Sequence, residues 1–246
     1  MNKESILYFE RVKEMMDRVL SEESTNVKQA ASILAKTIQE GGLIHIFGTG
    51  HSHIFAEEAF FRAGGLACIN PMLEPSLMLH AGAAKSSLLE NKPGIAEVIF
   101  EHFQPTPPDS MIIFSNSGVN YVPLQMASIA RERGIPLIGI GSKAYSQYLA
   151  EKRNCKSISE YCDVFIDNKG EIGDACIEIS GLPQKIAPTS TVIGTFVLNL
   201  LLVESIAKLL KESNVVPPVF VSGNLPGGKE KNRELIEHYR RLVKML

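Results

Sequence analysis

Two short polar segments of this chain contain residue types that could bind an anion. Gly48-Thr49-Gly50-His51-Ser52 follows the apolar run 43–47, and Ser115-Asn116-Ser117-Gly118 follows the run 110–114. Glycine turns leave backbone N–H groups exposed and let a ligand approach closely, while hydroxyl and amide side chains add further donors. Two such turns on one parallel sheet face the same edge. The sequence therefore predicts that their donors converge on one phosphate group.

Side chains able to move protons lie in and after the first segment. His51 and His53 could contact a substrate oxygen or act as acid or base. Glu57 lies four residues after His53, and Glu58 with Arg62 has the spacing of a surface ion pair on a helix. His51, His53 and Glu57 are close in sequence, and no distant residue is compelled to join them around a metal ion. We therefore predict no metal and no cofactor.

The segment 70–82 adds a second acid and a second histidine. It contains two prolines, Glu74 and His80, and it follows the apolar run 66–69, which we expect to be the second strand. Loops at the carboxyl ends of strands gather catalytic residues in α/β proteins. His80 ends an apolar run, so a buried, hydrogen-bonded role and a catalytic role are both open for it. Glu90, a little further on, has no informative pattern of its own.

The rest of the chain must position these residues, and its pattern predicts one α/β domain, residues 1–246. Strand-like runs alternate with helical segments between residues 41 and 211, which is typical of a three-layer αβα, doubly wound parallel sheet of about five strands. Residues 1–40 are expected to form two N-terminal helices, and residues 212–246 a loop and a C-terminal helix. With 45% hydrophobic residues, a chain of 246 residues can bury a full-sized core.

Four local features complete this prediction. The helix after Ser52 is expected to run to about Ala63, and the polar segment 142–159 has no clear assignment. Residues 175–179 alternate like an edge strand or one arm of a hairpin. In Pro188-Thr189-Ser190-Thr191, the hydroxyls are expected to cap the long apolar helix that follows.

The composition argues against several classes of function. Lys and Arg total 25 against 27 Asp and Glu, with no basic stripe, so we predict no nucleic-acid partner. The four cysteines show no C-x-x-C spacing and fit reduced thiols of a cytoplasmic protein. The first 20 residues lack the uncharged segment of a signal peptide. The apolar run 192–210 contains Asn199, Glu204 and Lys208, which favours a buried helix over a membrane span.

A dinucleotide site is one alternative for a doubly wound sheet. The G-x-G-x-x-G pattern fails at its third glycine, where His53 stands. No acidic residue ends the expected second strand, where it would hold a ribose. A nucleotide-linked oxidoreductase is therefore the weakest of the functions considered.

The two turns, in this order and followed by a Pro-Thr-Ser-Thr helix start, resemble the sugar isomerase (SIS) domain family over about residues 43–210. The overall pattern is most similar to bacterial SIS proteins labelled phosphoheptose isomerases. The resemblance implies a flavodoxin-like sheet, a sugar-phosphate ligand, and a homodimer or homotetramer. It implies that Ser52, Ser115 and Ser117 bind the phosphate, with Asn116 against the same group and Asn120 where a threonine is usual. Together with the loop N–H groups, the predicted phosphate site is Gly50, His51, Ser52, Ser115, Asn116, Ser117 and Asn120.

The resemblance is weaker for the catalytic residues. Phosphoheptose isomerases carry a glutamate on the helix after the first loop, where this chain has Arg62, and a histidine on the last core helix that is missing here. Arabinose phosphate isomerases keep an acid and a histidine after the second strand, which Glu74 and His80 resemble at a different spacing. Aldose–ketose interconversion needs a base and an acid beside a bound phosphate. We therefore predict that His80 acts with Glu74 or Glu58, with His53 in reserve.

Three functions follow from these residues. The first is a phosphosugar isomerase, and an amino-sugar-phosphate deaminase or lyase would use the same parts. The second is a sensor that binds a sugar phosphate without converting it, which the missing family base and histidine favour. The third is the oxidoreductase already described.

Overall fold

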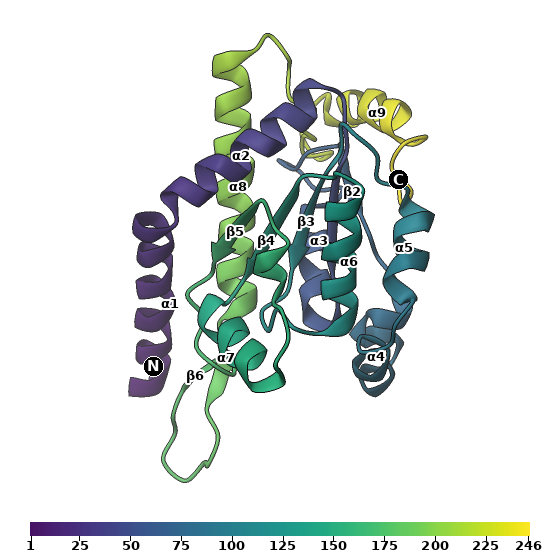
Figure 1. Ribbon diagram of the computed structural model, residues 1–246. Helices are drawn as coiled ribbons and strands as arrows, with labels where there is room; N and C mark the ends of the chain where they lie inside the picture. Colours follow the sequence, from purple (N-terminus) through teal and green to yellow (C-terminus); the bar gives the residue numbers. More distant parts are fainter.

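A five-stranded parallel sheet forms the centre of the molecule (Figure 1). In the computed structural model, which describes residues 1–246, the strands lie in the order β2-β1-β3-β4-β5, and every neighbouring pair is parallel. Their bounds are β1 Ile44–Gly48, β2 Ile69–Pro71, β3 Ser110–Phe114, β4 Leu137–Gly141 and β5 Val164–Asp167. The predicted doubly wound sheet of about five strands is confirmed. Its strand order reverses between β1 and β3, which makes that point the expected ligand crevice.

Helices cover both faces of this sheet, which gives the three predicted layers. One face is covered by α2 Ser24–Gln39, α3 Ile54–Ala59 and α8 Ser190–Glu212, and the other by α5 Ile95–Phe103 and α6 Tyr121–Glu132. Along β3, Ile112 and Phe114 belong to the core on the α8 side, whereas Met111 and Ile113 belong to the core on the α6 side. Because successive side chains of a strand point to opposite faces, a continuously apolar strand serves both cores.

The remaining elements lie around the edges of the sheet. They are the helices α1 Lys3–Glu22, α4 Ala83–Leu89, α7 Lys143–Arg153 and α9 Gly228–Tyr239, the short 3-10 helices η1 Gly50–His53, η2 Pro75–Leu77, η3 Leu79–Ala81 and η4 Ile158–Glu160, and the strands β6 Ala175–Ile177 and β7 Ile186–Pro188. β6 and β7 pair as an antiparallel hairpin outside the main sheet, as expected for one arm at 175–179. The unassigned polar segment contains α7, which begins where the Ser142 hydroxyl accepts a hydrogen bond from the Tyr145 N–H.

Two predicted boundaries are wrong, and each reflects contacts with the C-terminal segment. α3 ends at Ala59 instead of near Ala63, because Phe61 turns back with φ of 46° and packs edge-on against Phe220 at 5.3 Å between ring centroids. β2 starts later than residue 66, because Leu66 forms an antiparallel bridge with Val219. Pairings between segments so far apart in sequence leave no local signal.

α8 is the longest helix and lies across one face of the sheet (Figure 1). It is long and apolar enough to cross a membrane by length and composition alone, with a mean hydropathy of 1.8 in its most apolar window. In this fold it is a core helix that packs against α2, and Ile193, Val197 and Leu201 are fully buried. Its outer side exposes some apolar side chains, since Val203 and Leu210 are 62% and 59% exposed.

A buried polar network joins β1, β2 and the residue that precedes β3, at the amino-terminal edge of the sheet. His45 Nε2 lies 3.0 Å from Asp109 Oδ2, and the Asn70 amide lies 3.3 Å from His45 Nδ1. The backbone N–H groups of Leu43 and Thr106 also donate to the Asp109 carboxylate. Burial raises the pKa of Asp109, but these hydrogen bonds outweigh it and hold the pKa below its usual range. The network therefore favours the charged carboxylate.

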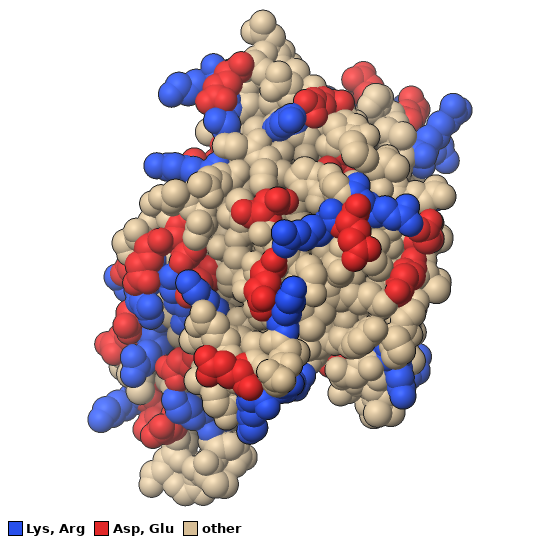
Figure 2. Space-filling model, in the orientation of Figure 1, with Lys and Arg blue, Asp and Glu red and all other residues tan.

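Charges of both signs are interspersed over the face shown in Figure 2. The net charge of the whole chain is −2. That face carries no extended basic surface.

Candidate functional site

The two predicted loops leave the sheet side by side. In the sheet register, Gly48 at the end of β1 pairs with Phe114 at the end of β3, so Thr49 and Ser115 begin neighbouring loops. Gly141 at the end of β4 pairs in turn with Asp167 at the end of β5. The loops after β1, β3, β4 and β5 therefore share one edge of the sheet.

A small, partly open cavity lies among these loops and the start of α8. Its polar lining comes from four elements: Ser52 after β1, Ser115 and Asn116 after β3, Asn168 after β5, and Ser190 in the first turn of α8. Its remaining lining residues are Phe55, Phe114, Ile140, Gly141 and Gly194. We call this cavity the cradle. Three of the predicted phosphate residues, Ser52, Ser115 and Asn116, lie on it.

Two glycines make room for the cradle serines. A Cβ atom on Gly48 would lie 2.4 Å from the carbonyl oxygen of Ser52, and one on Gly141 would lie 2.1 Å from the carbonyl oxygen of Ser115. Both distances are far below van der Waals contact, so any larger residue would displace the loop that it touches. The two serines are thus positioned by close backbone approach.

Hydrogen bonds fix the orientation of the cradle's amide and hydroxyl groups. The Gly170 N–H donates to Asn168 Oδ1, so the Asn168 amide nitrogen is directed at Asn116 Oδ1, 2.9 Å away. Because its oxygen is already an acceptor, Asn116 has its NH₂ group left to donate. Ser115 Oγ accepts from the Gly118 N–H at 3.1 Å, which leaves the Ser115 hydroxyl hydrogen for a ligand. Both side chains can therefore donate to an anion.

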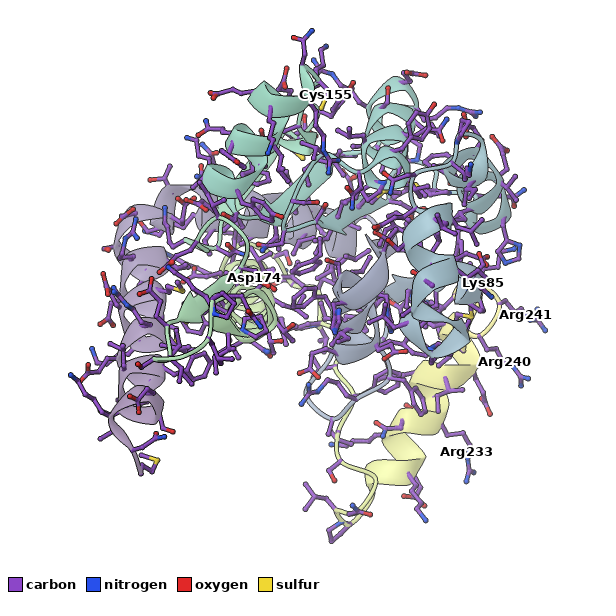
Figure 3. The ribbon with its side chains drawn as sticks, turned by 90° about the horizontal axis from the view of Figure 1, so that it is seen from below. Lys85, Cys155, Asp174, Arg233, Arg240 and Arg241 are labelled. Carbon is purple, nitrogen blue, oxygen red and sulfur yellow. The ribbon has the colours of Figure 1, made fainter.

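Asp174 caps the N-terminus of α8 beside the cradle (Figure 3). Its carboxylate accepts from the N–H groups of Thr189 and Ser190 at 3.1 and 2.9 Å, and from the Ser190 hydroxyl at 2.6 Å. The expectation that the Thr189 and Ser190 hydroxyls cap this helix is therefore wrong, because the hydroxyl of N-cap Thr189 makes no capping bond and a carboxylate from the β6–β7 region takes that place. Since the Ser190 hydroxyl donates its hydrogen to Asp174, its oxygen can only accept hydrogen bonds from a ligand in the cradle.

No free lysine enters the cradle from its β5 side. Lys169 follows Asn168, but its ammonium group lies 3.2 Å from Glu22 and 3.3 Å from Asp167, and it also pairs with Glu23. Burial lowers the pKa of Lys169, but the hydrogen bonds and charges of these carboxylates outweigh it and raise the pKa overall. Three other cations, Arg233, Arg240 and Arg241, lie along the C-terminal segment away from Asp174 (Figure 3). Anion binding in the cradle would depend on neutral donors.

The other predicted phosphate residues do not line the cradle. Gly50 has φ of 55°, a conformation that glycine adopts readily, and His51 is exposed. Asn120 precedes α6, and its side-chain oxygen accepts from Arg153 at 3.3 Å. Ser117 is half-buried in the same loop as Ser115. Phosphate contacts from these four residues remain predictions.

Two predicted histidines lie together beside the first loop. The rings of His53 and His80 are 6.1 Å apart between centroids in an edge-on arrangement. His53 is buried, its Nδ1 is hydrogen-bonded to the Gly50 carbonyl oxygen, and its Nε2 lies 3.7 Å from Glu57. His80 is exposed, so a core role for it is excluded and a role in contact with a ligand stays open.

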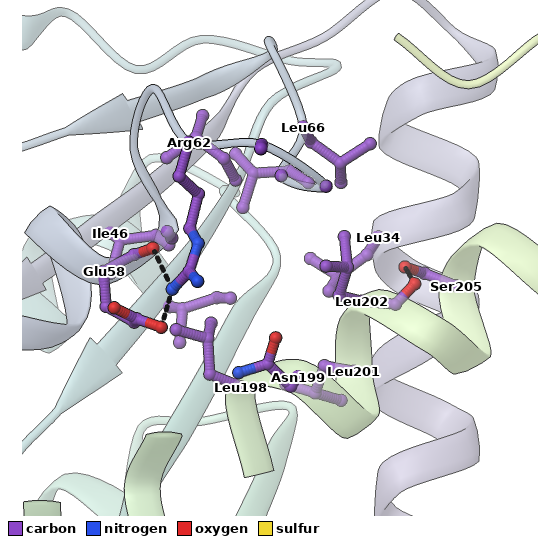
Figure 4. Close-up of a pocket in the computed structure, with 17 residues that line it drawn as sticks. Leu34, Ile46, Glu58, Arg62, Leu66, Leu198, Asn199, Leu201, Leu202 and Ser205 are labelled. Carbon is purple, nitrogen blue, oxygen red and sulfur yellow. Dashed lines mark hydrogen bonds and ion pairs between the residues drawn. The ribbon is translucent and has the colours of Figure 1, made fainter. Parts of the chain in front are cut away.

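The two predicted glutamates are both occupied by local contacts. Glu74 accepts from the Ser76 N–H at 2.9 Å and caps the short helix η2. Glu58 forms an ion pair with Arg62 (Figure 4). That pair lines a separate, mostly apolar pocket between α2, α3, α8 and the sheet, which shares no lining residue with the cradle. Glu58 therefore lies apart from the phosphate loops.

Comparison with known proteins identifies the family. Residues 7–142 match the family model described as SIS domain. This chain belongs to the SIS domain family. This SIS protein is 41% identical over 240 residues to the UPF0309 protein of Geobacillus thermodenitrificans, covering 97% of this chain and 96% of that protein.

Solved structures share the fold of this SIS protein. A phosphoheptose isomerase from Francisella tularensis aligns with a TM-score of 0.53 and 12% identity, covering 83% of this chain and 98% of that one. The Vibrio vulnificus NanR protein complexed with ManNAc-6P aligns with a TM-score of 0.50 and 12% identity, covering 97% of this chain and 69% of that one. At these identities the likeness shows a common fold.

Sequence reasoning missed two polar groups at this edge of the sheet. Asn168 directly follows a strand that the pattern did predict, so the same edge argument that selected Ser115 could have selected it. Asp174 precedes β6 in a left-handed conformation with φ of 70°, and no spacing rule links it to a helix that begins sixteen residues later in the chain.

Proposed function

We propose that this SIS protein binds a phosphorylated sugar, with the phosphate in the cradle, and catalyses aldose–ketose isomerisation or a related phosphosugar reaction. The observation that carries the proposal is the convergence of Ser52, Ser115 and Asn116 on one small cavity at the carboxyl edge of the sheet. That cavity lies beside the reversal of strand order between β1 and β3, where doubly wound sheets bind their ligands.

The chemistry of the lining suits a phosphate held by hydrogen bonds. Hydroxyl and amide donors with fixed partners offer several short bonds to anionic oxygens, and bonds to a charged acceptor are stronger than bonds between neutral groups. The neighbouring imidazoles of His53 and His80 support a reaction that moves protons between adjacent oxygens or carbons. Phosphate binding would hold the sugar in register beside them.

The first experiment is a thermal shift with a panel of pentose, hexose, heptose and N-acetylamino sugar phosphates, with free sugars and NADH as controls. A ligand present at a hundred times its dissociation constant adds about 2.7 kcal/mol, which is roughly 5–10 °C for a chain of this size. We expect a selective rise with one or a few sugar phosphates. Ser115→Ala should weaken that ligand roughly tenfold or more, because a hydrogen bond to a charged group contributes about 1.5–3 kcal/mol.

Ser128→Ala is the matched control. Ser128 is on α6, and its hydroxyl is hydrogen-bonded to Glu132 on the protein surface. This variant should bind as the wild type does. Equal binding by Ser115→Ala and Ser128→Ala would remove the cradle from the proposal.

A sensor that binds a sugar phosphate without converting it is the second candidate. Arg62 stands where phosphoheptose isomerases carry a glutamate, and the NanR protein of similar fold is described in complex with ManNAc-6P. Incubating each stabilising ligand with the protein and following the products by NMR distinguishes the two. A new ketose or aldose phosphate supports the isomerase, release of ammonia or of lactate from a lactyl ether supports the deaminase or lyase, and unchanged ligand supports the sensor.

We also propose that the chain forms a homodimer or homotetramer in the cytoplasm. The exposed apolar residues Val203 and Leu210 on α8, with Phe9 on α1 at 63% exposure, support a contact with a second copy. Sedimentation equilibrium measures the state directly, and a monomer at micromolar concentration would contradict this part of the proposal.

A further inference from the structure

We propose that Glu90 is the catalytic base of this SIS protein. The inference rests on the isomerase function proposed above and assigns a residue to its proton transfer. Glu90 follows α4, and its carboxylate Oε2 accepts a hydrogen bond from Thr49 Oγ1 at 2.9 Å. Thr49 is the first residue after β1 and lies in the loop that leads to Ser52. A carboxylate from a distant segment thus reaches the first phosphate loop.

Glu90 also contacts the element that follows the second loop. Its backbone carbonyl oxygen accepts from the Val122 N–H in the first turn of α6, at 2.9 Å. The same residue is therefore tied to the chain after β1 and to the chain after β3. These two strands flank the point where the strand order reverses, so Glu90 is held at the crevice where a ligand of this fold is expected.

Other glutamates near the loops are committed to partners, whereas Glu90 is not neutralised. Glu58 pairs with Arg62, Glu74 caps η2, and Glu57 lies 3.7 Å from His53. No lysine, arginine or histidine forms an ion pair with Glu90, which is half-buried, and Thr49 occupies only one of its two carboxylate oxygens. A partly desolvated carboxylate with a free oxygen is the kind of group that removes a proton from carbon.

The proton transfer balances without any further reagent. In the open-chain aldose phosphate, Glu90 removes the proton from C2, the electron pair of that C–H bond forms the C1=C2 bond, and the former carbonyl oxygen O1 takes a proton. Loss of the O2 proton then forms the C2 carbonyl, and the proton on Glu90 is returned to C1. His80 and His53, whose rings lie 6.1 Å apart beside the first loop, are the groups that we assign to the exchange of the oxygen-bound proton.

The test uses the sugar phosphate found in the thermal-shift panel, in D₂O. Wild-type protein is expected to place deuterium on carbon in recovered substrate and product. Glu90→Gln keeps the size of the side chain and its acceptor oxygen for Thr49, so it should retain ligand binding within about threefold while turnover and deuterium incorporation fall roughly 10²- to 10⁴-fold. Glu90→Asp keeps the carboxylate on a shorter side chain and should retain measurable exchange.

Glu97→Gln is the control, since Glu97 lies on neighbouring α5 and is hydrogen-bonded to Gln125 on the surface. Glu97→Gln should incorporate deuterium into substrate and product at the wild-type rate. Turnover at the wild-type rate in Glu90→Gln would overturn the assignment of Glu90 as the base but would leave the proposed isomerase function standing. Equal loss of binding and turnover in Glu90→Gln also overturns it, because Glu90 would then only hold the Thr49 loop. A wild-type protein that binds a sugar phosphate without exchange or turnover contradicts both the isomerase function and the role of Glu90.

Discussion

Gly48→Ala tests whether Ser52 contacts the ligand. The added Cβ atom would lie 2.4 Å from the Ser52 carbonyl oxygen and 2.8 Å from the Ser52 Cβ atom, whereas ordinary contact begins at 3.4 Å. Ser52 must therefore move by about 1 Å, since the neighbouring β1 backbone is held on both sides by β2 and β3. A shift of that size breaks a hydrogen bond whose normal length is about 2.7–2.8 Å.

The loss follows from the energy of one hydrogen bond to a charged group. Removing about 1.5–3 kcal/mol raises the dissociation constant of a sugar phosphate roughly 10- to 150-fold. The overpacking also destabilises the fold by about 1–3 kcal/mol. Isothermal titration at a temperature where the variant is fully folded measures the first effect separately from the second.

Gly42→Ala is the matched control at the opposite edge of the sheet. Its Cβ atom would lie 2.7 Å from the Pro108 carbonyl oxygen, so it should destabilise the protein in a similar way. Because it is remote from the cradle, it should leave sugar-phosphate affinity unchanged in the folded protein. Unchanged affinity in Gly48→Ala, or an equal loss in both variants, would refute the placing of the phosphate against Ser52.

Two further predictions concern stability. Asp174→Ala removes the acceptor for two N–H groups at the start of α8 and should lower the unfolding free energy by about 1–2 kcal/mol, or roughly 2–8 °C in thermal midpoint. The control is Glu178→Gln, which should change the midpoint little because the Glu178 side chain is 84% exposed on the same hairpin. Equal midpoints for the two variants would contradict the capping role. Because the folded pKa of Asp109 is depressed, its stabilisation is fully present above its unfolded pKa of about 3.9 and is lost as pH falls through the folded value. Asp109→Asn should therefore flatten the dependence of urea midpoint on pH below about pH 4, and a slope equal to that of the wild type would show that the network does not favour the carboxylate.

The sheet and its loops could be predicted because their signals are local. β1, β3, β4 and β5 are short, largely apolar runs that end at a glycine or are followed directly by a serine or an asparagine, and the parallel arrangement then places these ends at one edge. Ser52, Ser115 and Asn116 meet for that reason alone. The errors at Ala63 and residue 66 arose where the chain pairs with residues 218–220, which no local pattern can reveal.

The polar groups that orient the cradle were harder to predict, because each acts through a distant partner. Asn168 acts through its hydrogen bonds to Asn116 and Gly170. Asp174 acts through its hydrogen bonds to the start of α8. Glu90 lacks any spacing relation to Thr49, which is 41 positions earlier in the chain. A sequence motif identifies the loop that contacts a ligand. The residues that hold this loop in place can be identified only from the folded structure.

The cradle's internal hydrogen bonds have a consequence for binding. Asn116 is held by Asn168, the Ser115 hydroxyl by the Gly118 N–H, and the start of α8 by Asp174, all in the absence of a ligand. Groups already fixed in one orientation lose little further conformational entropy when an anion arrives, and that loss is about 0.5–1.5 kcal/mol for each side chain that must be immobilised. Asn168→Ala should therefore weaken a sugar phosphate by several-fold, although Asn168 need not touch it, because Asn116 would have to be ordered by the ligand itself. An affinity equal to that of the wild type would mean that Asn116 is oriented by other contacts or does not bind the phosphate.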